Sequence, residues 1–282
     1  MTDEPHDGRS GIERDGFSYL PRFISLTESE QLIADFTSAN PIWESRHRSD
    51  AHARDGASSR RITRPVYWLG GWQFACLGYY AEPHYREGRC LRAEPFSLVI
   101  DKILERLRPL LETHDPHVAE AGPPNTCLIN YYGSEIGKGP PVDQARLRMH
   151  RDGEPGPVVM FSIGQPGLLE FLEPDSTAPE LAVWTRHRSV VVFSGPVFKD
   201  RLYHRLVRVR HGEEPQLSSP VPDFRLRRIS TSFRYVPEEL ISEFHELPLK
   251  SRAHVRGYVE QLATGSAHFA QQLKTQKPSR PE

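Results

Sequence analysis

The chain has 282 residues, and its 37% hydrophobic, 10% aromatic and 26% charged residues are typical of a folded globular protein and exclude a disordered or fibrous chain. Lys and Arg number 36 and Asp and Glu 37, so the formal charge of −1 excludes binding of nucleic acid through overall charge. The 3 cysteines are too few for a disulfide framework, and no run of about 18 apolar residues predicts a membrane span. We expect one monomeric domain without a signal peptide, located in the cytoplasm.

The first quarter of the chain predicts one helix among irregular segments. Residues 1–15 show no apolar period and predict a loose, disordered tail. Thr27 and Glu30 have the spacing of a capping box, and the apolar residues that follow at helical spacing predict a helix over 27–38. Residues 44–65 hold 6 arginines and few apolar side chains, which predicts a basic, mobile loop.

A second helix and then a series of strands follow. Pro95 precedes an apolar stripe with a period of 3.6 residues that is expected to end near Pro109. From residue 126 to 236 the apolar residues gather in short β-type runs between turns, and the residues after 237 return to helical spacing. The runs are Cys127–Tyr132, Val158–Ile163, Leu168–Leu172, Leu181–Trp184, Val190–Ser194, Leu202–Val207 and Leu226–Tyr235. They predict a sandwich or barrel, so the fold class is mainly β with flanking helices (α+β).

Two histidines and an aspartate are candidate metal ligands. His150 and Asp152 stand at i and i+2, so in an extended segment their side chains project to the same side. His204 can supply a third ligand, and two histidines with one carboxylate leave the other face of a metal open, as in the facial triad of non-haem Fe(II) oxygenases. In a chain with 13 histidines, a His-x-Asp triplet can also be a hydrogen-bonded surface pair.

A later strand carries a second cluster of polar side chains. Alternation sends Arg228, Ser230, Ser232 and Arg234 to one face of this strand and the intervening residues to the other. If the polar face lies inside the fold, the two guanidinium groups need carboxylate partners, and a dicarboxylate supplies them in bidentate geometry. A solvated basic strand face is the alternative.

Five motifs follow one another along the strand-rich half. They are Cys127-Leu-Ile-Asn-Tyr-Tyr132, His150-x-Asp152, Val191-Val-Phe-Ser-Gly-Pro196, Tyr203-His204 and Arg228-x5-Arg234. Their order and approximate spacing resemble those of AlkB-type 2-oxoglutarate and Fe(II)-dependent dioxygenases over roughly residues 65–236. The resemblance implies a double-stranded β-helix (jelly-roll) core with an N-terminal substrate lid, and a requirement for Fe(II), 2-oxoglutarate and O2.

The resemblance also implies roles for individual residues. It places Fe(II) on His150, Asp152 and His204. It places 2-oxoglutarate on Asn130, Tyr132, Arg228, Ser230, Ser232 and Arg234. Ser232 stands where the family usually has threonine, and Ser230 replaces an asparagine that is common between the two arginines.

Three residues resemble the family's substrate-binding positions. Trp72 and Tyr79 lie in a segment that resembles the part of AlkB proteins that contacts the flipped base and its backbone, and an indole can stack on a cationic methylated base. Glu154 matches an acidic position that binds the exocyclic amine of the base. Packing in the core is the alternative for Trp72 and Tyr79, and a turn is the alternative for Glu154.

The chain is expected to divide into four parts. These are the tail 1–15, the N-terminal helices and nucleotide-recognition lid 16–125, the catalytic jelly roll 126–236 and a C-terminal helical extension 237–282. The loops at 133–147 and 208–223 look longer than in short family members, and the extension has no counterpart in those members.

The expected function is oxidative removal of N-methyl groups from bases such as 1-methyladenine and 3-methylcytosine, in single-stranded DNA or RNA, as in repair of alkylation damage. Residues 186–234 hold 11 basic and 4 acidic residues, which allows local binding of phosphate. One alternative is a 2-oxoglutarate oxygenase acting on a protein side chain or a small molecule. Another is a non-catalytic jelly-roll module that binds nucleic acid.

Overall fold

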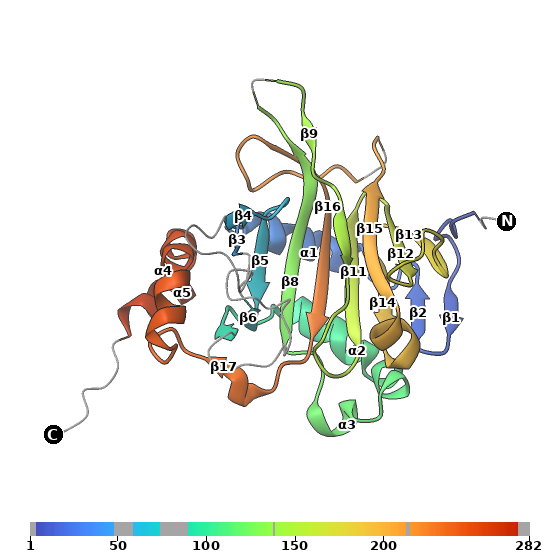
Figure 1. Ribbon diagram of the computed structural model, residues 1–282, viewed down its shortest axis with the longest axis horizontal. Coiled ribbons are helices and arrows are strands. Elements are labelled where there is room, and N and C mark those ends of the chain that lie inside the picture. Colours follow the sequence, from blue (N-terminus) through green and yellow to red (C-terminus); the bar gives the residue numbers. More distant parts are fainter. Residues whose placement is uncertain (1–3, 48–58, 74–89, 138, 213–214, 276–282) are drawn as a thin grey trace.

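Two antiparallel β-sheets face each other and form the centre of the fold (Figure 1). The structure is a computed structural model of the chain, and it describes residues 4–47, 59–73, 90–137, 139–212 and 215–275. The larger sheet has the order β1-β2-β14-β11-β16-β8-β5, with β9 paired to β8, and the smaller sheet has the order β10-β15-β12-β13. This arrangement is a jelly roll, so the predicted fold class is confirmed.

The strands of the larger sheet are β1 (Ile12–Arg14), β2 (Phe17–Leu20), β5 (Val66–Leu69), β8 (Thr126–Glu135), β9 (Val142–Asp143), β11 (Val158–Gly164), β14 (Ser189–Phe193) and β16 (Phe224–Arg234). Those of the smaller sheet are β10 (Leu147–His150), β12 (Gly167–Leu172), β13 (Leu181–Thr185) and β15 (Tyr203–Val209). Each predicted β-type run overlaps one of these strands. The larger sheet also takes in β2 and β5, which precede the expected boundary at residue 126.

Alternation along the central strands separates two apolar layers. In β14, Val190 and Val192 pack in the layer under the helices, whereas Val191 and Phe193 pack between the two sheets. Strand β16 places Ile229 in the first layer, as predicted. Because both faces of these strands are covered, their sequences are continuously apolar except where polar residues enter the space between the sheets.

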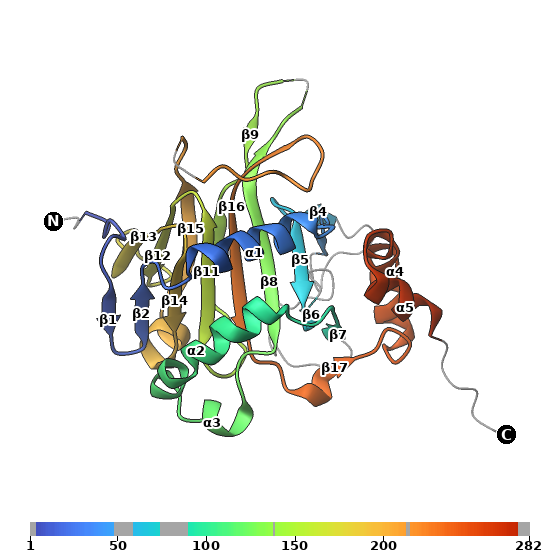
Figure 2. The ribbon, with the colours of Figure 1, turned by 180° about the vertical axis from the view of Figure 1, so that it is seen from behind.

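Helix α1 (Leu26–Ser38) crosses the outer face of the larger sheet beside α2 (Leu98–His114) (Figure 2). The predicted helix over 27–38 is confirmed, but its predicted capping box is wrong by two residues. Ser25 is the N-cap, because its hydroxyl accepts a hydrogen bond from Glu28 N at 3.2 Å and Ser25 N donates to Glu28 Oε2 at 2.8 Å.

Helix α2 continues past the predicted end at Pro109. Proline cannot donate a backbone hydrogen bond, so the position costs the helix one bond. The apolar stripe nevertheless continues beyond it, and Leu107 and Leu111 are both buried. Packing of this stripe therefore keeps the helix intact to His114.

An ion pair joins the two helices. Arg106 donates to both carboxylate oxygens of Glu28, at 2.6 and 3.0 Å, and this contact lowers the pKa of Glu28 to about 2. We expect Glu28→Gln to lower the free energy of unfolding at pH 7 by about 1 kcal/mol, since the pair is partly exposed. A carboxylate whose pKa is depressed by folding stabilises the fold at pH values above its pKa in the unfolded chain. The difference in free energy of unfolding between the variant and wild type should therefore shrink as pH falls from about 4.3 towards 2.

Denaturant titrations of both proteins at pH 7 and at pH 3 test this prediction. Glu30→Gln, an exposed change in the same helix, serves as the control and should have little effect at either pH. If Glu28→Gln lowered the free energy of unfolding equally at pH 7 and at pH 3, the assigned ion pair would be contradicted.

The N-terminal residues are ordered where a loose tail was expected. Strand β1 pairs with β2, and His6 forms a β-bridge with Val183 of the smaller sheet. The prediction of a disordered tail is therefore wrong for these residues. The segment gains order by adding backbone hydrogen bonds to the edge of a sheet, for which an apolar period is not needed.

The predicted basic loop at 44–65 is also partly wrong. Strands β3 (Ser45–His47) and β4 (Ser59–Arg61) form a hairpin, and residues 48–58 lie outside the described part. Glu44 and Arg64, at either end of the segment, are 1% and 3% exposed. Both charged residues therefore belong to the interior.

The C-terminal extension packs against the end of the larger sheet. After the 3-10 turn Glu238–Leu240 and β17 (Ile241–Ser242), α4 (Leu249–Ala263) and α5 (Ala267–Lys274) form an antiparallel pair (Figure 1). Strands β6 (Gly71–Gln73), β7 (Cys90–Arg92) and β17 form a small sheet, and α3 (Val118–Ala121) follows α2. In the described part of the chain, every helix is too short or too polar to cross a bilayer.

Candidate metal centre and cosubstrate site

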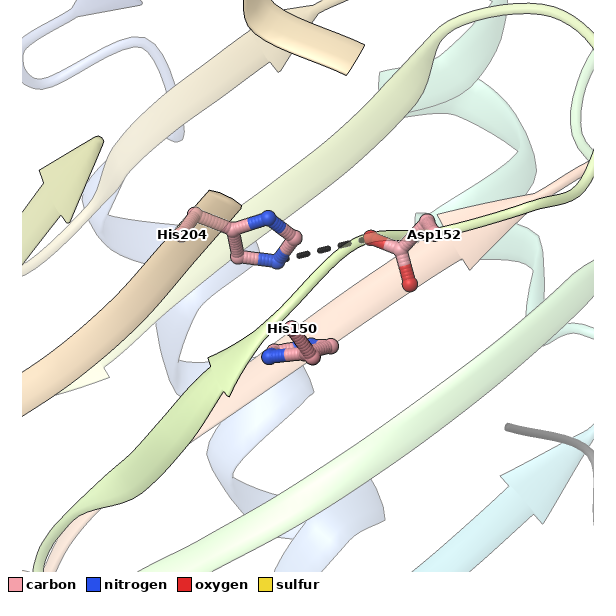
Figure 3. A group of neighbouring side chains, drawn as sticks. All are labelled: His150, Asp152 and His204. Atoms are coloured by element: carbon pink, nitrogen blue, oxygen red, sulfur yellow. Dashed lines mark ion pairs between the residues drawn. The ribbon is translucent and has the colours of Figure 1, made fainter. Parts of the chain in front are cut away.

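The two histidines lie on neighbouring strands of the smaller sheet. His150 ends β10 and His204 lies near the start of β15, and the strand register pairs the two residues directly. Asp152 follows two residues after His150. All three side chains converge (Figure 3), so the predicted triad is brought together from positions 54 residues apart.

The triad has the geometry of a metal-binding group. One ligand atom from each of the three residues lies within 4.8 Å of the others, and His204 Nε2 is 3.5 Å from Asp152 Oδ2. His150 Nδ1 lies 2.9 Å from the carbonyl of Arg148. Because a carbonyl oxygen only accepts, Nδ1 is the donor there and Nε2 is the nitrogen that can bind a metal.

Burial keeps both imidazoles neutral. Burial lowers the pKa of His204 to about 3 and also lowers the pKa of His150. The Arg234 guanidinium lowers both pKa values further, and the Asp152 carboxylate only partly opposes the effect of burial. Although burial by itself raises the pKa of Asp152, positive charge, first that of the Arg234 guanidinium, outweighs burial and holds this pKa below its usual value. Neutral imidazoles and a carboxylate are the protonation states that bind a metal.

Asp152 has one oxygen paired and one without a hydrogen bond. Oδ1 accepts from Arg234 Nε at 2.8 Å and lies 2.6 Å from Arg234 Nη2. Oδ2 is buried and accepts no hydrogen bond. A divalent cation fits this donor set, since it would bind Oδ2 together with the two imidazole nitrogens, and His150, Asp152 and His204 are therefore the residues that could hold Fe(II).

Arg228 is a fully buried guanidinium with neutral partners. It donates to the carbonyls of Gln165 and Thr185 and to the hydroxyls of Ser162 and Thr185, at 2.7 to 3.1 Å. Its Nε is buried without a partner, and burial lowers its pKa to about 10. Gly167 lies against it, and a Cβ there would come within 2.9 Å of Arg228 Nε.

Strand β8 contributes the other predicted cosubstrate residues. Asn130 and Tyr132 are both 2% exposed. Arg64 Nε donates to Asn130 Oδ1 at 2.6 Å, and the Arg64 guanidinium lies 5.5 Å from the Tyr132 ring centroid. No apolar period in the sequence identifies Arg64. Its one signal is its position directly before Pro65 and the apolar run of β5, which pairs with β8 at Asn130.

The two serines between the arginines face the same space. Ser230 and Ser232 are 2% and 7% exposed, and Ser230 Oγ is buried without a hydrogen-bond partner. The predicted alternation of Arg228, Ser230, Ser232 and Arg234 towards the interior is thus found, and the alternative of a solvated basic face is wrong.

The structure treats the three predicted substrate residues differently. Trp72 is fully buried, donates to Glu44 at 2.8 Å and packs edge-on against Phe269 of α5 at 5.5 Å, so it is a core residue and cannot present a face to a base. Tyr79 lies outside the described residues. Glu154 is 5% exposed, with its carboxylate 3.7 Å from Arg234 Nε.

The loop that carries Asp152 is tied to the segment before His204. The π-helical segment Pro196–Arg201 places the buried ammonium group of Lys199 against the carbonyls of Glu154 and Gly156. Arg151 in turn donates to the carbonyl of Asp200. These bonds connect the two chain segments that supply the triad, and they fix Asp152 relative to His204.

We expect Lys199→Met to weaken Fe(II) binding about tenfold, because substitutions behind metal ligands usually cost 10- to 100-fold in affinity. Arg201→Gln is the matched control, since Arg201 lies in the same segment but pairs with Glu173 and Glu180 on the outside. Anaerobic titration of both variants with Fe(II) makes the comparison. Equal Fe(II) affinities of the Lys199→Met and Arg201→Gln variants would show that Lys199 does not position the loop.

A family model and solved structures match most of this chain. The family model described as the 2OG-Fe(II) oxygenase superfamily matches residues 16–234. The structure of OsALKBH1 is similar with a TM-score of 0.52 at 16% identity, over 79% of this chain and 99% of that chain. A prolyl-4-hydroxylase of Pseudomonas putida is similar with a TM-score of 0.39 at 16% identity, over 79% of this chain and 94% of that chain. Curated protein sequences give no match.

The chain belongs to the 2OG-Fe(II) oxygenase superfamily. The expected membership among 2-oxoglutarate and Fe(II)-dependent oxygenases is therefore confirmed, and the fold is similar to that of OsALKBH1. The protein is accordingly an Fe(II)- and 2-oxoglutarate-dependent dioxygenase that uses O2, and the alternative of a non-catalytic module is set aside.

Proposed function

We propose that this dioxygenase removes N-methyl groups from bases of single-stranded nucleic acid, with 1-methyladenine and 3-methylcytosine as the first substrates to test. The observation that carries the substrate class is the charge beside the triad. Arg146 and Arg148 are exposed on the edge of the smaller sheet, and Arg148 lies two residues before His150. Arginines placed there can bind backbone phosphates on either side of a base that enters the site.

The proposed cosubstrate residues follow from burial and charge. Arg228 has only neutral partners, so the carboxylate of 2-oxoglutarate remote from the metal would give its guanidinium the ionic partner that the protein does not supply. Asn130, Tyr132, Ser230 and Ser232 line the same interior space and would orient the molecule. Arg234, the remaining proposed cosubstrate residue, also keeps Asp152 ionised and in place.

When bound, Fe(II) with 2-oxoglutarate and O2 supplies the oxidant that hydroxylates a C–H bond, while 2-oxoglutarate is converted to succinate and CO2. The protein's residues hold the triad, neutralise the dicarboxylate and exclude water from a site that is largely buried. Hydroxylation of an N-methyl carbon gives an unstable hemiaminal that releases formaldehyde. Glu154 is proposed to accept a hydrogen bond from the exocyclic amine of the base, and the cytoplasmic location and monomeric state stay predictions.

The test is release of formaldehyde and succinate with Fe(II), ascorbate and 2-oxoglutarate, comparing methylated and unmodified DNA and RNA oligonucleotides. Release that depends on the methylated base supports the proposal. The double variant Arg146→Gln/Arg148→Gln should raise the KM for the oligonucleotide about tenfold at low salt, whereas Arg256→Gln on α4 should leave it unchanged. Succinate release that no oligonucleotide changes would point to a protein or small-molecule substrate.

A further inference from the structure

A second basic site lies at the far end of the jelly roll from the triad. Four chain segments surround a cavity of about 470 Å³, and its lining includes Arg9, Arg22, Arg186, His187 and Arg188. None of the described residues that line it is acidic. Asp7, beside the cavity, is exposed and pairs with Arg9 at 3.4 Å. The cavity is therefore lined by four arginines and no carboxylate, and one of the four has an ion-pair partner at the surface.

Two of these arginines occupy backbone positions that favour glycine. Arg22 has a φ of 56° and Arg188 a φ of 66°, both in the left-handed region. Arg22 follows Pro21 in the turn after β2, and Arg188 ends the three-residue turn between β13 and β14. Glycine is the usual residue at such positions of both kinds of turn. The chain has arginine at both positions, and both residues line one cavity.

Hydrogen bonds fix two of the guanidinium groups in place. Arg188 Nε donates to the carbonyl of Ile24 and Arg186 Nε to that of Asp7, each at 2.7 Å. His187 accepts from Gly164 N at 3.3 Å through Nδ1, and burial lowers its pKa to about 4, so it is neutral. The guanidinium groups are thus oriented before any ligand arrives.

The cavity is separate from the metal triad. Arg188 directly precedes β14 and lies five residues before Phe193, roughly 16 Å along the chain, and the Phe193 ring packs against His204 at 5.0 Å. The cavity adjoins the surroundings of Arg228, which donates to the carbonyls of Gln165 and Thr185, the neighbours of Pro166 and Arg186. The inference accordingly goes beyond the proposed substrate and can be tested with metal-free protein and an unmodified strand.

We propose that this cavity is a binding site for phosphate groups. Arginine forks match the geometry of phosphate oxygens, and a cavity of this size holds one or two phosphate groups with their immediate substituents. The phosphate can come from the backbone of a nucleic-acid strand or from a free phosphorylated compound. The two sources share this chemistry and are separated by the choice of probe.

The test measures binding of a labelled oligothymidine 20-mer and of inorganic pyrophosphate to metal-free protein. Arg22→Gly and Arg188→Gly should each weaken binding about tenfold. Each should also reduce the slope of log affinity for the strand against log salt concentration by about one. Because glycine suits the left-handed backbone, Arg22→Gly should not lower the melting temperature, and in Arg188→Gly the relaxed backbone should offset the lost hydrogen bond to Ile24.

Asp223→Gly is the matched control, since Asp223 has a φ of 54° and lies outside the cavity. It relaxes the same kind of backbone without removing a cavity charge, and it should not weaken either probe. Weaker binding of both probes in the arginine variants supports a strand as the source, and weaker binding of pyrophosphate alone supports a free compound. Unchanged binding of both probes, or an equal loss in Asp223→Gly, would overturn the proposal.

Discussion

Asp152→Ala is expected to abolish Fe(II) binding and 2-oxoglutarate turnover, and also to lower the free energy of unfolding of the metal-free protein by about 3 kcal/mol. The second effect arises because Arg234, 3% exposed, would lose the carboxylate that it contacts through Nε and Nη2. Glu154 lies 3.7 Å from Arg234 Nε and would compensate in part. Fe(II) titration and denaturant unfolding of the metal-free protein measure the two effects.

A second substitution separates the two roles of Asp152. Asp152→Ala combined with Arg234→Met should recover part of the lost stability, because the buried guanidinium is removed together with the carboxylate that it contacts, but it should not recover Fe(II) binding. Asp152→Asn keeps the side-chain volume and serves as the variant to study if the alanine variant does not fold. If metal-free Asp152→Ala were as stable as the metal-free wild type, the buried ion pair would be refuted.

Arg228→Lys is expected to raise the KM for 2-oxoglutarate about 10- to 100-fold while changing kcat little at saturating cosubstrate. A lysine keeps the charge but loses the planar fork, so it cannot bind a carboxylate in bidentate geometry and hold Ser162 and Thr185 as well. The position is six residues along β16 from Arg234, so the change lies away from the metal ligands. Steady-state succinate formation over a range of 2-oxoglutarate concentrations measures it.

Gly167→Ala tests the same arginine without altering its chemistry. The added methyl group would meet Leu206 Cδ1 at 2.8 Å and Arg228 Nε and Cζ at 2.9 and 3.1 Å, so the guanidinium and the leucine must shift and the KM should again rise. Arg225→Gln is the control, because Arg225 lies on the same strand with an exposed side chain. If the KM were unchanged in both Arg228→Lys and Gly167→Ala, Arg228 would not bind the cosubstrate.

The strands of the jelly roll could be predicted because their apolar runs are long and bounded by turns. Nearly every residue of β8, β11, β14 and β16 is buried, which leaves a clear signal in the sequence. Strands of two to four residues, such as β1, β3 and β6, carry no such period. They form through backbone hydrogen bonds to existing edges, and the sequence of the segment alone does not report where an edge will be.

The site was predictable in its ligands and less so in its surroundings. His150, Asp152 and His204 follow from residue type and motif order, and the inward face of β16 follows from alternation. Arg64 was missed because burial of an arginine depends on partners that are distant in the chain, here Asn130. Trp72 was misassigned because the local sequence around an aromatic residue is similar whether the residue stacks on a base or packs in a core. Helix α5, which buries Trp72, lies about 200 residues later in the chain.

The direct pairing of His150 with His204 has a consequence for the durability of the fold. Strand β10 has only four residues and, in the described part of the chain, one strand neighbour, so it is the easiest strand of its sheet to detach. An ion held by both imidazoles links it to β15 through side chains, much as a disulfide would. Each tenfold excess of Fe(II) over its Kd then adds about 1.4 kcal/mol to the stability of the folded chain. Iron supply is therefore expected to set how long this protein survives in a cell as well as how fast it works.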